Sequence, residues 1–360
     1  MGTKRPTIYC AVTGHGFGHG VRMACVVAEI QRLRPDCLFI LATRAPRWLL
    51  ESYIPGDFIH RPIALDVGVI QSDSLQMDLG ATRRELMAVY QAKNALIAQE
   101  ANYLRQNQAD LVLADIPALA VSLAHQAGIP AWLMGNFGWN FIYRDWGAAF
   151  FDLAEQIEAD YQACDQLFCL PLAEPMTIFP QRRDVGLTGG TPRYSEAELR
   201  EDLALKTPPE RTVLLTFGGL GLAAIPYGTL DKFPDWRFLT FDAQAPKLPN
   251  LISLPPGSYR PVDVMPLCGR VISKPGYSTF AEALRLGVPL VSLTREGFAE
   301  APILLAGLQD YGQHQIIETA NFFLGRWDFL EEEPSPPRLT EKLDPNGAES
   351  IAQSVVDFLS

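Results

Sequence analysis

A glycine-rich turn near the start of the chain combines two histidines with a bare backbone. The turn runs from Thr13 to Gly20 as Thr-Gly-His-Gly-Phe-Gly-His-Gly, so His15 and His19 are four residues apart. Glycines let the backbone approach a ligand closely, and an imidazole can exchange a proton near neutral pH. We therefore expect His19, which lies next to the following helix, to act as a general base, with His15 as a second catalytic candidate.

Other interpretations of this turn are weaker. It lacks the final Gly-Lys-Ser/Thr of a phosphate-binding loop, and its glycine spacing differs from the dinucleotide-binding fingerprint. No carboxylate lies between the two histidines, so a metal site is not expected there. The remaining alternative is that the histidines only cap or pack the turn.

A second group of candidates lies in the other half of the chain and suits a nucleoside diphosphate. Lys274-Pro-Gly-Tyr-Ser278 joins an expected strand to a helix, whose N-terminal N–H groups favour an anion. We expect Ser278 to cap this helix and Glu282, one turn further on, to reach ribose hydroxyls. Glu282 and Glu300 alternatively belong to a solvated face. The residues expected to bind such a nucleotide, here called the donor-binding residues, are Gly218, Gly219, Lys274, Gly276, Ser278, Thr279, Glu282, Glu296 and Glu300.

Polar and aromatic side chains also follow two expected strands of the first half. Asp115 ends one of these strands, and Asn136, Trp139 and Asn140 follow the next. Asp115 either orients a neighbouring group or caps a helix. Trp139 either lies at the rim of a cleft, where an aromatic ring suits a sugar, or belongs to the core. The candidates on this side of the expected cleft, here called the acceptor-side residues, are Gly16, Phe17, Asp115, Asn136, Trp139 and Asn140.

The elements that must position these residues alternate between short apolar runs and longer helical ones. In the first half, strands are expected at 8–12, 37–42, 58–63, 110–114 and 131–134, with helices at 21–33, 83–106 and 118–127. In the second half, strands are expected at 213–217, 238–241, 251–254, 271–273 and 290–293, with a helix at 279–286. Such alternation favours parallel sheets covered by helices on both faces.

The pattern predicts an α/β fold with two doubly wound, Rossmann-like domains that face a central cleft. The expected divisions are an acceptor-side domain at 1–170, a linker at 171–210, a donor-binding domain at 211–343 and a closing helix at 344–360. The linker contains one expected helix at 195–203, and the closing helix is expected to begin near Asp344-Pro345. Ligands of open α/β sheets bind at the carboxyl ends of the strands.

Composition excludes several classes of protein. The 360 residues are 48% hydrophobic, which excludes a disordered chain, and no apolar stretch reaches the ~20 residues that a bilayer span needs. A net charge of −11 gives no support for nucleic-acid binding. The six cysteines show no zinc-binding or paired spacing, and the N-terminus has no secretory apolar region. A cytoplasmic protein with reduced thiols and no transmembrane segment is therefore expected.

Four segments resemble the glycosyltransferase-like N-terminal half of plant L-arabinokinases. They are residues 13–19, 135–143, 274–283 and 295–302, and the likeness extends from residue 9 to about residue 330. The layout more remotely resembles GT-B nucleotide-sugar glycosyltransferases of the peptidoglycan N-acetylglucosaminyltransferase type. This chain departs from that pattern at His15, at Phe17 and at Lys274-Pro275, and it contains no sugar-kinase phosphate loop.

The resemblance implies a GT-B fold with a UDP-sugar bound in the C-terminal domain. It places His19 near the reaction centre, Gly276, Ser278 and Thr279 at the diphosphate, and Glu282 at the ribose. The implied activity is a metal-independent, inverting glycosyltransferase that moves a hexose or pentose from a nucleotide diphosphate sugar to a hydroxyl acceptor. No cofactor is expected, and the chain has no Asp-x-Asp to bind a divalent cation. The alternatives are a nucleotide-sugar epimerase of the same fold and a non-catalytic UDP-sugar sensor or partner protein.

Overall fold

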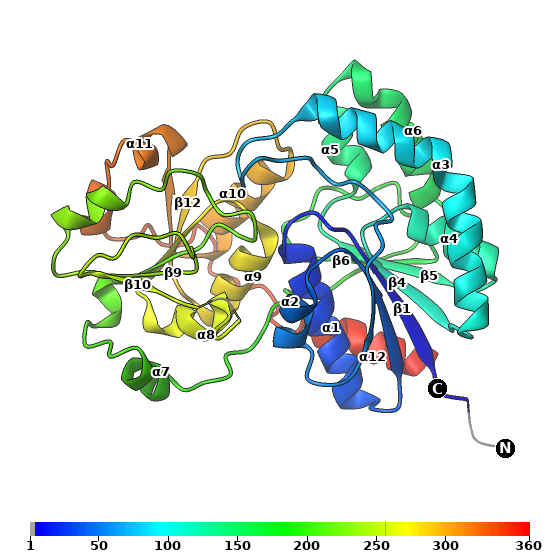
Figure 1. Ribbon diagram of the computed structural model, residues 1–360, viewed down its shortest axis with the longest axis horizontal. Coiled ribbons are helices and arrows are strands. Elements are labelled where there is room, and N and C mark those ends of the chain that lie inside the picture. Colours follow the sequence, from blue (N-terminus) through cyan, green and yellow to red (C-terminus); the bar gives the residue numbers. More distant parts are fainter. Residues whose placement is uncertain (1–3, 256) are drawn as a thin grey trace.

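The computed structural model describes residues 4–255 and 257–360 and contains two parallel sheets (Figure 1). The first sheet has seven strands in the order β3-β2-β1-β4-β5-β6-β7, and the second has six in the order β10-β9-β8-β11-β12-β13. Each strand of both sheets pairs in parallel with its neighbours. The predicted α/β fold with two doubly wound sheets is therefore confirmed.

The first sheet takes up the N-terminal half of the chain. Its strands are β1 (Thr7–Val12), β2 (Leu38–Ala42), β3 (Ile59–Arg61), β4 (Leu111–Asp115), β5 (Ala131–Gly135), β6 (Gln166–Cys169) and β7 (Arg182–Asp184). Its helices are α1 (Gly18–Leu33), α2 (Arg47–Tyr53), α3 (Leu79–Gln106), α4 (Leu119–Ala127), α5 (Trp139–Asp145) and α6 (Phe151–Tyr161), with a short 3-10 turn η1 (Ala148–Phe150). Every residue of β1 and β4 is buried, as expected for parallel strands covered on both faces.

The second sheet follows in the C-terminal half. Its strands are β8 (Thr212–Leu215), β9 (Arg237–Thr240), β10 (Leu251–Ser253), β11 (Arg270–Ser273), β12 (Leu290–Leu293) and β13 (His314–Ile317). The helices are α7 (Glu196–Asp202), α8 (Pro261–Val264), α9 (Tyr277–Leu286), α10 (Glu300–Tyr311), α11 (Thr319–Phe323) and α12 (Gly347–Phe358). Short 3-10 turns are η2 (Pro209–Arg211), η3 (Tyr227–Lys232), η4 (Met265–Leu267) and η5 (Asp328–Glu331).

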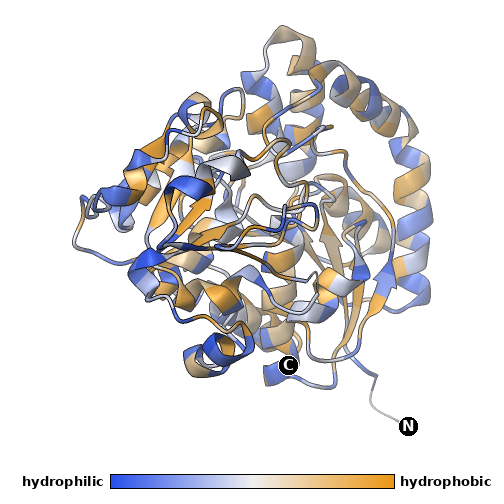
Figure 2. Cartoon of the chain, turned by 60° about the vertical axis from the view of Figure 1, so that its left-hand side comes forward, coloured by the Kyte–Doolittle hydropathy of each residue, from blue (hydrophilic) through white to orange (hydrophobic). Residues whose placement is uncertain are grey.

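The two halves of the chain share an apolar interface. Buried residues of β1, α1, α9 and α12 belong to one continuous cluster, and α1 packs against α9 across the boundary. Figure 2 shows apolar residues concentrated in the strands and polar residues along the outer faces of the helices. The helix α12 returns to the first half and packs on α1 (Figure 1). There the Phe358 and Trp132 rings lie 5.0 Å apart, so the last helix is held against the N-terminal sheet.

Several elements differ from the sequence-based expectation. The strand β7 extends the first sheet into the segment expected as a linker. Its sequence Arg-Arg-Asp is exposed and charged, as is typical of an edge strand, so no apolar run announced it. The last helix begins after Asn346, which occupies the cap position, and Asp344 accepts a hydrogen bond from the Asn346 N–H instead of capping the helix. Within the described residues, no helix has the length and apolar character needed to cross a bilayer.

Candidate functional site

The turns that follow the central strands of both sheets meet at one cleft. Strand order reverses between β1 and β4 in the first sheet and between β8 and β11 in the second, and such reversal points bind ligands in open α/β folds. A cavity of about 100 Å³ lies there. We call it the central cleft. Side chains and glycines of both halves line it, including His15, Gly16, Phe17, His19, Arg22, Gly218, Gly219, Lys274, Gly276, Ser278, Thr279, Arg295, Phe298 and Glu300.

His19 is the second residue of α1, and its ring faces the central cleft while being 7% exposed. Its Nδ1 lies 2.8 Å from Asp115 Oδ1 and 2.9 Å from Arg22 Nη2. Because an ionised carboxylate oxygen can only accept a hydrogen bond, we assign a proton to Nδ1 in the contact with Asp115. Nε2 is then the nitrogen free to accept a proton. Burial lowers the pKa of His19 against the opposing charge of Asp115, so the ring is neutral at pH 7.

Asp115 ends β4 and is fully buried. Arg22 donates a hydrogen bond to each of its carboxylate oxygens, from Nε to Oδ2 and from Nη2 to Oδ1. Burial raises the pKa of the Asp115 carboxyl, but the charges and hydrogen bonds of Arg22 and His19 together outweigh this effect and leave the pKa below its usual value. Of the two interpretations left open by the sequence, Asp115 therefore orients His19 and Arg22, and α4 is capped elsewhere, at Ala118.

A chain of hydrogen bonds links this pair to the other half of the molecule. Arg22 Nη1 donates to Asn136 Oδ1 at 2.7 Å, and Asn136 Nδ2 donates to Glu300 Oε1 at 2.7 Å. Asn136 follows β5 and Glu300 opens α10, so the contact crosses the cleft. All of these side chains are buried. The position of His19 is thus tied to a carboxylate of the C-terminal half.

The opposite wall of the central cleft carries positive charge. Burial, together with the neighbouring Arg295, lowers the pKa of Lys274 to about 7. Burial likewise lowers the pKa of Arg295 to about 10, and its guanidinium lies 4.0 Å from the Phe298 ring centroid. Glu300 is the one acidic side chain among the described residues that line this cleft. The wall therefore favours an anionic ligand.

The start of α9 also faces the central cleft, with Gly276 at the cap position. The prediction that Ser278 caps this helix is wrong, because Ser278 lies inside the first turn and its hydroxyl donates to the Gly18 carbonyl at 2.8 Å. The backbone N–H groups of this turn can bind phosphate oxygens. Across the cleft, a Cβ on Gly219 would lie 2.5 Å from the Phe17 ring, so a glycine is needed where the two halves approach.

A second, more apolar cavity of about 310 Å³ adjoins the central cleft. We call it the side cavity. Its walls include Trp48 and Tyr53 of α2 together with Phe241, Tyr259, Arg260 and Glu282 of the C-terminal half, and it shares Phe17, Gly218, Gly219, Ser278 and Thr279 with the central cleft. Aromatic rings, a buried carboxylate and a shared border with an anion-binding wall suit a nucleoside.

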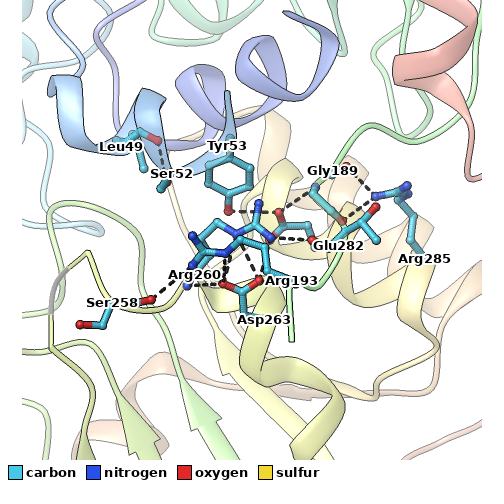
Figure 3. Close-up of polar contacts among 12 residues, drawn as sticks. Leu49, Ser52, Tyr53, Gly189, Arg193, Ser258, Arg260, Asp263, Glu282 and Arg285 are labelled. Carbon is cyan, nitrogen blue, oxygen red and sulfur yellow. Dashed lines mark hydrogen bonds and ion pairs between the residues drawn. The ribbon is translucent and has the colours of Figure 1, made fainter. Parts of the chain in front are cut away.

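Glu282 is held in place at the side cavity (Figure 3). Its Oε1 accepts hydrogen bonds from the Gly190 N–H at 3.1 Å and from the Tyr53 hydroxyl at 3.3 Å. Burial raises the pKa of Glu282 to about 7, against these bonds and the charge of Arg260. Arg260 lies over the Tyr53 ring and is itself anchored to Asp263 at 2.7 Å. Oε2 of Glu282 accepts no hydrogen bond from the described residues, so it is the oxygen available to a ligand.

The structure does not bring every sequence-based candidate to the cleft. Trp139 is buried and its ring lies 5.3 Å from that of His15, so it packs beneath the first turn, which matches the core alternative. Asn140 is buried in α5 and does not line the central cleft. Glu296 is exposed and lines neither cavity. These three residues therefore lie away from the ligand-facing surface.

Other residues at the site were missed from the sequence. Arg22 and Arg295 are buried, a placement rare for arginine. Asp66 accepts hydrogen bonds from the Thr13 hydroxyl and from Trp139 Nε1, each at 2.9 Å, and burial raises its pKa to about 7. Arg22 follows His19 by three residues on α1, and this spacing on one helix face was the available signal. No group of three or more His, Cys, Asp or Glu side chains in the described part of the chain is arranged to bind a metal ion.

The chain is similar in sequence to part of a known protein. L-arabinokinase of Arabidopsis thaliana is 30% identical in an alignment of 330 positions that covers 88% of this chain and 31% of that protein. The chain thus spans about a third of the length of this curated relative. No protein-family model matches the chain.

Two solved structures have the same architecture. The glycotransferase of kitacinnamycin is 15% identical with a TM-score of 0.64, and the match covers 99% of this chain and 100% of that one. The UDP-GlcNAc 2-epimerase from Neisseria meningitidis, solved with UDP-GlcNAc bound, is 15% identical with a TM-score of 0.59 and 98% of each chain covered. The chain is therefore homologous to part of L-arabinokinase and has the GT-B fold of nucleotide-sugar glycosyltransferases.

Proposed function

We propose that this protein is a metal-independent, inverting glycosyltransferase. It takes a hexose or pentose from a nucleotide diphosphate sugar, with UDP as the nucleotide, and transfers it to a hydroxyl acceptor. One observation carries the proposal: a neutral histidine held by a buried carboxylate faces a cationic wall and a helix N-terminus across one cleft. The histidine and its carboxylate can remove a proton from the acceptor, and the cationic wall can stabilise the departing diphosphate.

The proposed reaction is a single displacement. His19 Nε2 removes the proton of the acceptor hydroxyl while the acceptor oxygen forms a bond to the anomeric carbon. The bond between that carbon and the phosphate oxygen breaks, and the nucleoside diphosphate leaves with the electron pair. Asp115, bonded to Nδ1, stabilises the imidazolium that forms. One base on one side of the sugar supports inversion at the anomeric carbon.

Side chains and backbone supply the positive charge that the leaving group needs. Lys274 and the N–H groups at the start of α9 face the cleft from the C-terminal half. In a water-poor cleft, such fixed donors stabilise developing charge strongly. This arrangement supports a reaction that proceeds without a divalent cation.

The ribose position can be tested at Glu282. We expect Glu282→Gln to weaken the binding of UDP-glucose by ~10-fold, because the amide nitrogen cannot accept a hydrogen bond from a ribose hydroxyl. Binding of inorganic pyrophosphate, which has no ribose, should be unchanged. Glu296→Gln is the control, because Glu296 is exposed and lines neither cavity, and its affinity should match that of the unaltered protein. Equal affinity of Glu282→Gln and the unaltered protein in calorimetry would place the ribose elsewhere.

Donor binding should depend on pH through Lys274. Its pKa near 7 in the free protein means that the ammonium is largely charged at pH 6 and largely neutral at pH 8. A bound diphosphate favours the charged form, so affinity for UDP-glucose should fall as pH rises above 7, by up to about tenfold per pH unit. Lys274→Met should bind weakly with a flatter profile between pH 6 and 8. An unchanged affinity across this range would separate Lys274 from the diphosphate.

An epimerase is the second candidate, favoured by the similarity to UDP-GlcNAc 2-epimerase over nearly the whole chain. The two activities differ in what happens without an acceptor. An epimerase converts one UDP-sugar into its stereoisomer, which proton NMR detects, whereas a transferase leaves the donor sugar intact or releases UDP slowly.

The donor itself can be found by thermal shift. A ligand that binds only the folded protein raises the melting temperature, so UDP-, GDP-, ADP- and dTDP-sugars can be ranked directly. We expect UDP-sugars to give the largest increase, and the best donor then goes into the NMR assay. No shift with any nucleotide sugar would contradict the proposed function.

A further inference from the structure

The guanidinium of Arg295, which lines the central cleft, has a buried hydrogen-bonding edge without a partner among the described residues. The residue is 8% exposed, and its Nε and Nη2 have no hydrogen-bond partner among the described residues. It follows β12, lines the cleft and is held flat against the Phe298 ring. Buried donors in proteins are satisfied in the great majority of cases, so an unsatisfied pair at a ligand cavity indicates a missing partner.

The same edge binds carboxylates elsewhere in this chain. Arg22 donates through Nε and Nη2 to the two oxygens of Asp115. Arg61 donates through the same two atoms to Glu100, at 2.8 Å and 2.5 Å. The two nitrogens are spaced to match the two oxygens of a carboxylate or phosphate. The pair that Arg295 leaves open is therefore the one that recognises an oxyanion.

Lys274 adds a second charge to the same wall. The half-buried Lys274 lies near Arg295, and each lowers the pKa of the nearby His15. Glu300 is the acidic group facing them among the described lining residues, and its Oε1 already accepts a hydrogen bond from Asn136. A half-buried lysine and a buried arginine thus share one carboxylate. An anion between them would balance this charge.

We propose that Arg295 and Lys274 form an oxyanion subsite of the central cleft. This inference rests on the proposed function only in taking the ligand to be a nucleotide sugar. Two parts of such a ligand carry the right chemistry: the diphosphate, and a carboxylate on the sugar itself, as in a uronic acid. Arg295 lies between β12 and α10, and Glu300 is the first residue of α10, so the subsite and Glu300 lie at the same edge of the second sheet.

The test measures binding to the full chain by calorimetry, with inorganic pyrophosphate, UDP-glucose and UDP-glucuronate as probes. Arg295→Met keeps the packing on Phe298 and removes the donors, and Arg295→Lys keeps the charge without the paired donors. The exposed Arg326, which contacts only Asn321 among side chains of the described residues, provides the control Arg326→Met. We expect Arg295→Met to lose at least tenfold in affinity, Arg295→Lys to recover part of it, and Arg326→Met to match the unaltered protein.

The probes whose affinity falls in Arg295→Met identify the anion that binds to this subsite. Equal losses for pyrophosphate, UDP-glucose and UDP-glucuronate assign the subsite to the diphosphate. A loss confined to UDP-glucuronate assigns it to a sugar carboxylate. Unchanged binding of all three probes by Arg295→Met would overturn the proposal. None of these readouts requires transfer, so failure of the proposed reaction would leave the test of the subsite intact.

Thermal unfolding separates a binding role from a structural one. Because the free protein leaves these donors unsatisfied, Arg295→Met should melt no lower than the unaltered protein when no ligand is present. The increase in melting temperature that pyrophosphate or the best UDP-sugar produces should be reduced or lost. A variant that melts lower without ligand yet keeps the full ligand-induced increase would show Arg295 to be structural and would contradict the proposal.

Discussion

Replacing His19 with alanine is expected to lower turnover by ~10²–10⁴-fold while leaving donor affinity nearly unchanged. The reason is that the imidazole acts on the acceptor hydroxyl, whereas the diphosphate and nucleoside are bound by the C-terminal half. Turnover is measured as nucleoside diphosphate released from the donor, and affinity by calorimetry. A loss of affinity equal to the loss of turnover would make His19 a donor-binding residue instead of the base.

The pH profile provides an independent check on His19. Burial lowers its pKa below the usual 6.5, so the ring is neutral and able to accept a proton throughout the neutral range. With the donor at saturation, the loss of activity that comes from protonation of His19 should therefore appear only as pH drops below that lowered pKa, and the residual activity of His19→Ala should lack this acid limb. His125→Ala is the matched control, because His125 is exposed and pairs with Asp165 at the surface. His15→Ala should cost less than His19→Ala, since His15 Nδ1 accepts a backbone N–H from Val69 and no carboxylate holds its ring.

Asp115→Asn is expected to have the largest effect on stability, because it leaves the buried guanidinium of Arg22 without its counter-ion. Removing one partner of a buried pair typically costs ~3–5 kcal/mol. Turnover should also fall by ~10²-fold or more, since the amide no longer holds His19 in the required tautomer. Denaturant unfolding and kinetic measurements on the same variant test both effects. A variant as stable as the unaltered protein would contradict the account of this pair.

Two controls distinguish the buried pair from an ordinary surface pair. Asp235→Asn removes an exposed partner of Arg211, and such pairs contribute ~0–1 kcal/mol. The double variant Arg22→Met/Asp115→Leu replaces the pair with apolar side chains and should recover stability without recovering activity. The folded-state pKa of Asp115 is lowered, so its stabilising effect is present above the unfolded value and is lost as pH falls. Asp115→Asn should therefore also reduce the sensitivity of stability to acid.

Much of the fold followed from local pattern. The buried strands β1 and β4 are largely apolar runs, β1 leads into the turn that carries the two histidines, and β4 ends at Asp115, so both the sheet and its ligand edge could be predicted. Elements with weaker patterns could not. The strand β13 begins with His314 and Gln315, and β7 is charged throughout, so neither has an apolar run that would separate it from a loop. These two segments are strands because β7 pairs with β6 and β13 pairs with β12.

The candidate site was predicted only in outline. His19, Lys274 and Glu300 line the same cleft because the segments that carry them follow β1, β11 and β12, at the carboxyl edges of the two sheets. The arginines that complete the site could not be found, since an arginine in a helix or after a strand is usually solvated. Their burial depends on partners far away in sequence, such as Asp115 for Arg22, which only the assembled fold brings together.

The most direct measurement is a crystal structure of the full chain with the UDP-sugar that gives the largest thermal shift. We expect the diphosphate to lie at the start of α9 beside Lys274 and Arg295. The nucleoside should lie in the side cavity near Glu282, and the anomeric carbon should face His19. A nucleotide bound outside the central cleft, or a sugar turned away from His19, would contradict the proposed function.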